Sequence, residues 1–379
     1  MASTLKLGKG NWGVKEDSLL AYSDQNNNFV PLPFDFSRAS SATVVNKAGL
    51  VEPVTSGLPR IDFSDDTNGA LLLEPQSTNL ITYSELLNTY FTTKSAGAVI
   101  TDNYGIAPNG LQSSSRIQFG ESDYCLRALS LSTNSTSSVY VKGISGETIQ
   151  FGVGANVAQG GIFTFNGSWQ RIEYTYQNGS GSILFSNLQG SATATDFEAW
   201  GLQVEDNTTY ATSYIPTAGA TATRVQDICI GAGSASTFNS TEGVLYAEIE
   251  TFSQTGTFRQ INLNNGSTSS RIYITKRAEN DLLEFRMDNA LGNLNLAFPV
   301  NTTNQFIKAA FRYGVNNFAV FIDGVNKNAT PNGNTFSAGT LNNLELNSPL
   351  DQPFFGKAKQ VTVFPTALSD AELEALTTI

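Results

Sequence analysis

The chain contains no histidine among its 379 residues. This absence excludes Ser-His-Asp and Cys-His nucleophilic catalysis, histidine-liganded zinc and acid–base catalysis by imidazole. Cysteine is also scarce, since only Cys125 and Cys229 occur, far apart and in neither a CxxC nor a metal-finger spacing. We therefore expect two buried thiols that pack as small apolar side chains, and no disulfide. A P-loop, or a GxGxxG phrase that opens a helix, is also lacking.

Positive charge and long apolar runs are in short supply as well. Lys plus Arg number 22 against 33 for Asp plus Glu, which gives a net charge of −11. Proteins that bind a phosphate backbone concentrate positive charge, so no nucleic-acid partner is expected. No apolar run approaches the roughly 18 residues that span a bilayer. The start, MASTLKLGKGNWGV, lacks the apolar core of a secretory signal. We expect no membrane partner, and synthesis in the cytoplasm.

The chain is rich instead in Gly, Ser, Thr and Asn, with β-branched and aromatic residues spread evenly and only 15% charged residues. This composition favours short strands joined by turns. The length exceeds the size at which one hydrophobic core stops growing, so two or three packed units are expected. A long coiled-coil or triple-helical fibre is excluded, because the sequence shows neither sustained heptads nor collagen triplets.

Residues 1–77 have an irregular pattern, with only short alternating runs such as Phe34-Asp35-Phe36. Five prolines interrupt this region: Pro31, Pro33, Pro53, Pro59 and Pro75. Such a segment cannot easily close a core of its own. We therefore predict an N-terminal arm that attaches to another protein or to neighbouring subunits.

Residues 78–226 show strand-like alternation of apolar and polar side chains. In SVYVKG, Val139 and Val141 alternate with Tyr140, and in TIQFGVG, Ile149 alternates with Gln150. One buried and one wet face is typical of an antiparallel β-sandwich. We predict one such domain here.

Residues 227–379 continue this pattern through TEGVLYAEIETF, RIYITKR, LLEFRMD and NNFAVFIDG, which predicts a second sandwich. A short helix is predicted near the C-terminus. Ser369 and Glu372 have the spacing of a capping box, and Leu368 and Leu373 that of a hydrophobic staple. The predicted fold class is all-β, with two antiparallel β-sandwich (jelly-roll) domains in tandem after an irregular N-terminal arm.

Several phrases resemble those of bacteriophage virion proteins. EAWGLQVEDNTTYATSYIPTAGATATRVQD (Glu198–Asp227) is similar to the segment that closes a β-sandwich domain in many of them. FDFSRASSATVVNKAGLVE (Phe34–Glu52), followed by GALLLEPQSTNLITYSE (Gly69–Glu85), resembles the N-terminal part of phage head-spike and tail-fibre proteins. The resemblance covers most of the chain. It implies a place in the virion, partners among other virion proteins and a homotrimer.

Two further resemblances concern the domains. Residues 78–226 as a whole look like a family 4/9-type carbohydrate-binding module, which is a jelly roll. The phrases FAVFIDGV and FFGKAKQVTVFPTALSDAELEALT resemble the last strands of laminin-G or concanavalin A-like lectin domains, which commonly end in such a helix. The implied partner is a host cell-surface polysaccharide.

The sequence leaves hydrolysis of a glycan open, because a glycosidase needs only an acid and a nucleophile or base about 5 to 10 Å apart. No catalytic phrase surrounds the acidic residues on predicted strands, so we do not expect an enzyme. Those residues are Glu173, Glu198, Glu205, Glu248, Glu250 and Glu284.

Calcium is the inorganic partner that a lectin-like sandwich would most readily hold. Asp65, Asp66, Asp196, Glu205 and Asp206 are the available ligands. The alternative is favoured, namely that these side chains form turns, because no spaced acidic loop of the EF-hand kind is present.

Sugar binding needs an aromatic face for the apolar side of a pyranose and polar groups for its hydroxyls. Trp169 and Trp200 lie at strand positions where a packing role is favoured. Better candidates lie on the predicted wet faces: Arg271, Tyr273, Glu284 and Arg286 in the third region, and Tyr140 with Gln150 in the middle one. If RIYITKR and LLEFRMD pair, Tyr273 would be ringed by charged side chains. The alternative is a solvated sheet face or a subunit interface.

The sequence thus favours a phage head fibre, spike or tail-fibre component that adheres to host-surface glycans. The alternative is a structural capsid decoration or connector that binds no sugar. A connector should expose large apolar patches, whereas an adhesin should expose an isolated aromatic among polar groups.

Overall fold

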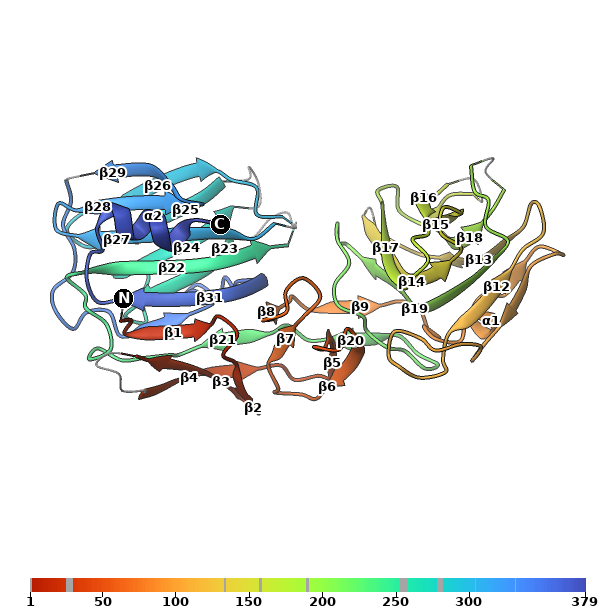
Figure 1. Ribbon diagram of the computed structural model, residues 1–379, viewed down its shortest axis with the longest axis horizontal. Coiled ribbons are helices and arrows are strands. Elements are labelled where there is room, and N and C mark those ends of the chain that lie inside the picture. The colour runs from red at the N-terminus through yellow and green to blue at the C-terminus, as the bar shows by residue number, and fades with distance from the viewer. Residues whose placement is uncertain are drawn as a thin grey trace. The chain divides into compact units, whose positions relative to one another are not determined.

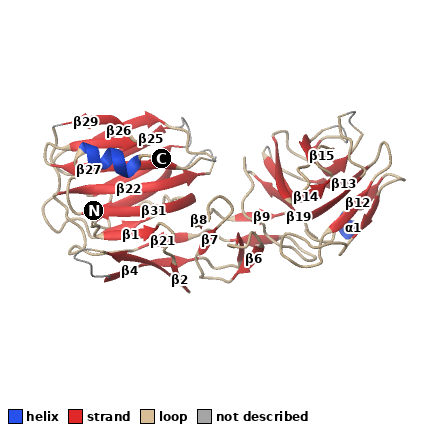
Figure 2. Ribbon diagram, in the orientation of Figure 1, coloured by secondary structure: helices blue, strands red, loops and turns tan. Residues whose placement is uncertain are grey.

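The computed structural model describes residues 2–24, 30–132, 134–156, 159–188, 191–252, 258–277, 282–303, 305–330 and 332–379. These residues form antiparallel β-sheets with two short helices, as Figures 1 and 2 show, so the predicted all-β class is confirmed. The chain divides into two compact units. Unit 1 comprises segments 1–39, 55–75 and 226–379, and unit 2 comprises segments 40–54 and 76–225. No helix of the described residues is long and apolar enough to cross a membrane.

Unit 1 contains a twelve-stranded and a five-stranded sheet. The larger sheet consists of β1 (Leu5–Gly8), β2 (Gly13–Lys15), β3 (Ser18–Ser23), β4 (Val30–Ser37), β7 (Arg60–Asp62), β8 (Ala70–Leu73), β21 (Ile228–Ile230), β22 (Glu242–Thr251), β27 (Ile307–Gly314), β28 (Phe318–Ile322), β29 (Val325–Thr330) and β31 (Gly356–Phe364). The smaller sheet has the order β26 (Leu294–Pro299), β25 (Leu282–Asp288), β24 (Arg271–Arg277), β23 (Phe258–Asn264) and β30 (Asn343–Glu345).

One hydrophobic core draws on both sheets of unit 1. Leu245 and Ala247 of β22 belong to it, as do Ile272 and Ile274 of β24 and Phe285 of β25. The residues that alternate with them point to the opposite face of each sheet. The period of two that the sequence shows therefore separates the side chains of this core from those of the opposite sheet faces, where Val244, Tyr246 and Tyr273 are buried as well.

The N-terminal residues take a different place from the predicted arm. β1 pairs with β31, and Leu5, Leu7 and Phe34 are buried in the core of unit 1. Pro31 and Pro33 are tolerated because they lie at exposed positions of β4, outside the Asp35–Ser37 stretch that pairs with β21. Segments from distant parts of the chain supply the core that this region cannot close alone.

The predicted C-terminal helix is present as α2 (Asp370–Thr377). The Ser369 side chain accepts a hydrogen bond from the Glu372 backbone N–H, and Glu372 accepts one from the Ser369 N–H at 2.8 Å, so the capping box is confirmed. Leu368 and Leu373 are both buried in a second apolar cluster of unit 1, with residues of β22, β27 and β28. The helix thus covers part of the outer face of the larger sheet.

Unit 2 is a sandwich of two five-stranded sheets around one core. The first sheet has the order β10 (Thr93–Lys94), β13 (Tyr124–Leu129), β18 (Gly181–Ser186), β15 (Thr148–Gly154) and β16 (Gly161–Thr164). The second has the order β11 (Val99–Thr101), β12 (Ser115–Gln118), β19 (Asp196–Asp206), β14 (Ser135–Gly143) and β17 (Gln170–Tyr176). The two-stranded pairs β5 (Ala42–Val45) with β6 (Val51–Val54) and β9 (Ser77–Asn79) with β20 (Ala222–Arg224), and helix α1 (Leu87–Tyr90), complete the unit.

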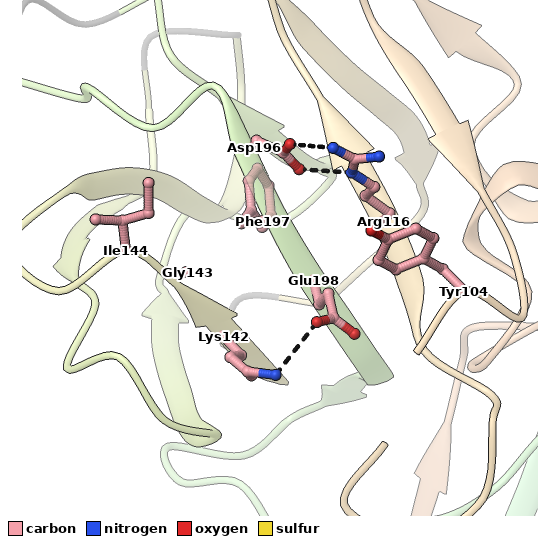
Figure 3. A pocket seen from close by; sticks show the side chains of 8 residues that line it. All are labelled: Tyr104, Arg116, Lys142, Gly143, Ile144, Asp196, Phe197 and Glu198. Atoms are coloured by element: carbon pink, nitrogen blue, oxygen red, sulfur yellow. Dashed lines mark hydrogen bonds and ion pairs between the residues drawn. The ribbon is translucent and has the colours of Figure 1, made fainter. Parts of the chain in front are cut away.

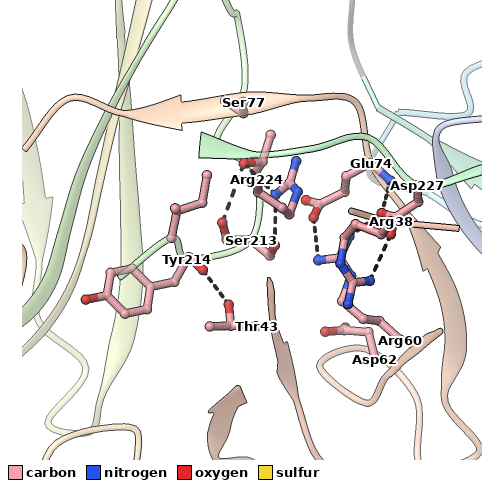
Figure 4. Close-up of polar contacts among 12 residues, drawn as sticks. Arg38, Thr43, Arg60, Asp62, Glu74, Ser77, Ser213, Tyr214, Arg224 and Asp227 are labelled. Atoms are coloured by element: carbon pink, nitrogen blue, oxygen red, sulfur yellow. Dashed lines mark hydrogen bonds and ion pairs between the residues drawn. The ribbon is translucent and has the colours of Figure 1, made fainter. Parts of the chain in front are cut away.

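A buried ion-pair network joins three separate segments of unit 1 (Figure 4). Asp227 pairs with Arg38 at 3.0 Å and also with Arg60, which in turn pairs with Glu74 at 2.7 Å. Arg38 further donates to the Thr55 carbonyl at 2.6 Å. Burial alone would lower the pKa of the Arg60 guanidinium, but Asp227 and Glu74 raise it above its usual value.

Both cysteines are free and fully buried, Cys125 in the core of unit 2 and Cys229 in that of unit 1, which fits the expected packing role. Burial raises the pKa of the Cys125 thiol to about 12, and it raises that of Cys229 as well. Because the thiolate is the reactive form, we expect the native protein to resist a thiol reagent at pH 8 and to react at both sites in strong denaturant. Rapid labelling of the native protein would contradict this prediction.

Candidate functional site

The four predicted site residues of the third region lie on one face of the five-stranded sheet of unit 1. β24 and β25 pair with Tyr273 opposite Arg286 and Thr275 opposite Glu284. We predicted that charged side chains surround Tyr273 if RIYITKR and LLEFRMD pair. The two strands do pair, and the prediction is confirmed. Arg271 belongs to the same face, where its Nε donates to Asp288 at 2.7 Å.

This face is closed rather than wet, which corrects the predicted exposure of its central residues. Tyr273 is only 1% exposed because the guanidinium groups of Arg271 and Arg286 lie 4.2 and 5.5 Å from its ring centre. Burial raises the pKa of Tyr273 to about 12, and its hydroxyl donates to Asp288 at 3.1 Å. Glu284 is also buried. The long arginine side chains that share the face therefore fill the space that a sugar would need.

The two predicted residues of the middle region do not form a site. Tyr140 lies on β14, where its ring centre is 5.6 Å from that of Trp200. The guanidinium carbon of Arg171 also lies 5.6 Å from the Tyr140 ring centre. Gln150 lies on β15, in the other sheet of unit 2, and is buried. The alternation of apolar and polar residues predicted that Tyr140 and Gln150 both lie on solvent-facing sides of their strands. The two strands belong to different sheets, so the side chains do not meet.

An open pocket of about 220 Å³ lies instead on the outer face of the second sheet of unit 2 (Figure 3). β19 supplies Asp196 and Glu198 from alternate positions, so both carboxylates share one face. The neighbouring strands place Arg116 of β12 and Lys142 of β14 opposite Glu198. The pocket is lined by Tyr104, Arg116, Lys142, Gly143, Ile144, Asp196, Phe197 and Glu198.

One wall of the pocket is a fixed arginine over an aromatic ring. Arg116 donates from Nε to Asp196 at 2.8 Å and from Nη2 to the second carboxylate oxygen. These hydrogen bonds raise the pKa of the Arg116 guanidinium, so it stays charged. The guanidinium carbon lies 4.9 Å from the ring centre of Tyr104. A two-point pair of this kind restricts the geometry of the arginine and leaves its Nη1 without a hydrogen bond to a described residue.

The other wall is a carboxylate held at both oxygens. Glu198 accepts from the Ser114 hydroxyl at 2.6 Å and lies 3.4 Å from the Lys142 ammonium. A Cβ at Gly105 would lie 2.2 Å from one Glu198 oxygen, so a larger residue there would force the Glu198 carboxylate to move from its present position. Lys142 also lies 6.0 Å from the ring centre of Trp169.

Tyr104 has a special place among the aromatic side chains. With 45% of its surface exposed, it is the most exposed aromatic side chain among the described residues. It lies beside four charged groups, two of each sign, and beside Ile144, which is also exposed. Tyr104 is thus an isolated exposed aromatic among polar groups, the feature expected of an adhesin.

The sequence named Asp196 only as a possible calcium ligand and Glu198 only among the acidic strand residues, and it did not single out Tyr104, Arg116 or Lys142, although part of the signal was present. The alternation of β14 puts Lys142 on the face of Tyr140, and that of β19 puts Asp196 with Glu198. Tyr104 carries no such signal, because it lies in a loop between β11 and β12 and no period indicates where a loop side chain points.

The aspartates and glutamate proposed as calcium ligands mostly have protein partners. Asp65 pairs with Lys357, Asp66 with Lys359 at 2.9 Å and Asp196 with Arg116. Within the described part of the chain, no group of three or more acidic or cysteine side chains is placed to hold a metal. Calcium binding, the less favoured of the two interpretations, stays untested.

No family model and no curated protein matches the chain. Among solved structures, it is similar to the CBM40 of Ruminococcus gnavus IT-sialidase bound to α2,3-sialyllactose, with TM-score 0.34 and 17% identity over 40% of this chain and 94% of that one. The SAP-like pentraxin from Limulus polyphemus follows, with TM-score 0.28 and 11% identity over 36% and 69%. The CBM22 tandem of Paenibacillus barcinonensis Xyn10C has TM-score 0.24 and 11% identity over 78% and 91%. At these TM-scores the likeness assigns no ligand to this chain.

Proposed function

We propose that this protein is a non-catalytic carbohydrate-binding component of a phage virion, a head fibre, spike or tail fibre, and that it adheres to host-surface glycans through the pocket of unit 2. The observation that carries the proposal is the exposed ring of Tyr104 beside Arg116, Asp196 and Glu198. An aromatic face for the apolar side of a sugar, flanked by planar hydrogen-bonding groups, is what recognition of a pyranose requires.

The charges of the pocket favour binding over hydrolysis. Cleavage of a glycosidic bond needs one carboxyl group that is protonated to act as the acid. Asp196 and Glu198 are each bound to a cation instead, Asp196 to Arg116 and Glu198 to Lys142. This arrangement supports a binding site in which the carboxylates accept hydrogen bonds.

The virion setting is supported by the sequence phrases described above. A homotrimer carried in several copies on a particle would present many pockets at once. Shallow sites of low individual affinity would then gain strength by avidity. In this proposal the remaining partners are other virion proteins, and the protein is made in the bacterial cytoplasm.

A structural capsid decoration or connector is the second candidate. It would use the exposed apolar side chains of unit 2, such as Ile106, Leu111 and Ile144, to pack against another subunit. The balanced charges beside Tyr104 favour the adhesin, because an obligate interface depletes charged residues at its centre.

The test measures binding of the labelled protein to candidate host bacteria before and after periodate oxidation of their surface glycans. We expect oxidation to abolish binding, and Tyr104→Ala to weaken it roughly tenfold, which corresponds to about 1.4 kcal/mol. The substitution should leave the fold intact because the ring is exposed.

Two matched variants complete this experiment. Ile162→Ala removes an exposed apolar side chain from the other sheet of unit 2 and should bind like the wild type. Arg286→Gln changes the closed face of unit 1 and should also leave binding unchanged. Binding that survives oxidation would point to a protein receptor, and full binding by Tyr104→Ala would remove the pocket from the proposal.

A further inference from the structure

We propose that the pocket of unit 2 selects neutral sugars that carry neighbouring hydroxyl groups and discriminates against acidic ones. This inference rests on the proposed function and adds the class of ligand. Three observations support it: the pocket has no net charge, its ion pairs leave some hydrogen-bond donors and acceptors unused, and the whole chain is negatively charged.

The pocket is neutral in sum. Arg116 and Lys142 each contribute one positive charge, and Asp196 and Glu198 each contribute one negative charge. Each cation already faces a carboxylate of the same pocket. An acidic sugar would therefore compete with Asp196 for Arg116 and with Glu198 for Lys142, and would lie beside the displaced carboxylate. Close like charges of this kind disfavour the complex.

The unused hydrogen-bonding groups suit hydroxyls. Nη1 of Arg116 makes no hydrogen bond to a described residue, and the Lys142 ammonium has three donors with one carboxylate contact. The side chain of Asp196 is 41% exposed, so its oxygens can accept a further bond from solvent or ligand. A hydroxyl group both donates and accepts, and two neighbouring hydroxyls can bind one carboxylate together. A ligand carboxylate or sulfate only accepts, and could donate no hydrogen bond to the exposed carboxylate of Asp196.

The charge of the whole chain acts in the same direction. A net charge of −11 repels a polyanionic glycan at a distance, and no positive excess in this pocket opposes that repulsion. A neutral glycan does not experience this field. Its affinity should accordingly depend little on ionic strength, whereas that of an acidic glycan would depend on it strongly.

The experiment uses the full chain and two sets of oligosaccharides with matched backbones. One set contains neutral gluco-, galacto- and manno-oligosaccharides, and the other contains the corresponding uronic-acid oligomers. Affinities are measured by titration calorimetry at about 0.05 and 0.5 M NaCl, which shortens the screening length severalfold. At low salt we expect at least one neutral ligand to bind roughly tenfold more tightly than its acidic counterpart. The affinity of that neutral ligand should change less than about twofold between low and high salt.

A charge-switch variant tests the origin of the selectivity. Asp196→Asn keeps the shape of the side chain but gives the pocket one net positive charge and releases Arg116. It should weaken neutral-sugar binding and raise the affinity for the uronic-acid oligomers at least about threefold. Asp66→Asn alters the net charge of the chain equally but lies in unit 1, where it pairs with Lys359, and should change neither affinity.

The outcomes separate the inference from the proposed function. A wild-type preference for uronic-acid oligomers that fades at high salt would overturn the neutral-sugar inference and leave glycan binding standing. Equal gains for Asp196→Asn and Asp66→Asn would overturn the local explanation in favour of net charge. If no oligosaccharide binds, the proposed function itself is overturned.

Discussion

Replacing Asp227 by alanine is expected to lower the free energy of unfolding of unit 1 by about 3 to 5 kcal/mol. The carboxylate is fully buried and holds two arginines, Arg38 and Arg60, that are buried as well. It also accepts the backbone N–H of Glu74 at 2.8 Å. Its removal would leave Arg38 and Arg60 with only the one negative charge of Glu74 in the network. A buried charge that has lost its partner destabilises the fold by more than the intact pair stabilises it. A loss of this size is a large part of the roughly 5 to 15 kcal/mol that a domain possesses.

Hydrogen exchange along a urea titration, read separately for peptides of each unit, would measure this effect. Protection should fall in β7, β8 and β21, and little in unit 2. Asp66→Ala is the matched control, because Asp66 forms a partly exposed ion pair with Lys359, and pairs in contact with solvent contribute about 1 kcal/mol or less. A loss below 1 kcal/mol for Asp227→Ala would show that the network is not needed for the stability of unit 1.

Replacing Trp200 by alanine is expected to lower the free energy of unfolding of unit 2 by about 3 to 5 kcal/mol. The ring is 1% exposed and lies 4.6 Å from that of Tyr214 and 5.6 Å from that of Tyr140. Val51 and Ala107 complete this apolar cluster. It covers part of the outer face of the sheet that carries the pocket, so truncation would open a cavity that several separate segments must close.

The same exchange experiment would locate this loss. Protection should fall in β14 and β19, while peptides of β22 and β31 in unit 1 should keep theirs. Trp200→Phe should recover part of the stability, because it restores most of the apolar volume. An equal loss of protection in unit 1 would contradict separate unfolding of the two cores, and a two-state analysis would then apply to the whole chain.

The strands and their buried faces were predictable because alternation is a local property. Val139, Ile149, Phe151, Leu245 and Ile272 are buried as their period of two indicates. The C-terminal helix was predictable for the same reason, since a capping box lies within four residues. Local spacing also identified β24 and β25 as polar on one face, and their pairing is confirmed.

Exposure of those polar faces could not be predicted in the same way. The exposure of Tyr273 depends on the conformations of the long Arg271 and Arg286 side chains, which lie against its ring. The alternation of residues along a strand does not predict these conformations. The pocket shows the converse case. Tyr104 belongs to a loop, and it meets Arg116 and Asp196 only because β11, β12 and β19 pair in that order.

The sequence by itself determined the all-β class, the faces of most strands, the terminal helix and the absence of any histidine-based chemistry. The tertiary structure alone decided how the chain is divided, because it places segments 40–54 and 76–225 in one unit and the rest in the other. Arg38, Glu74 and Asp227 occur in the three phrases that resemble phage virion proteins, and they meet in one buried network. Arg38 and Asp227 are separated by 189 positions in the sequence and meet only in the folded chain. No local sequence pattern predicts which distant carboxylate pairs with a buried arginine.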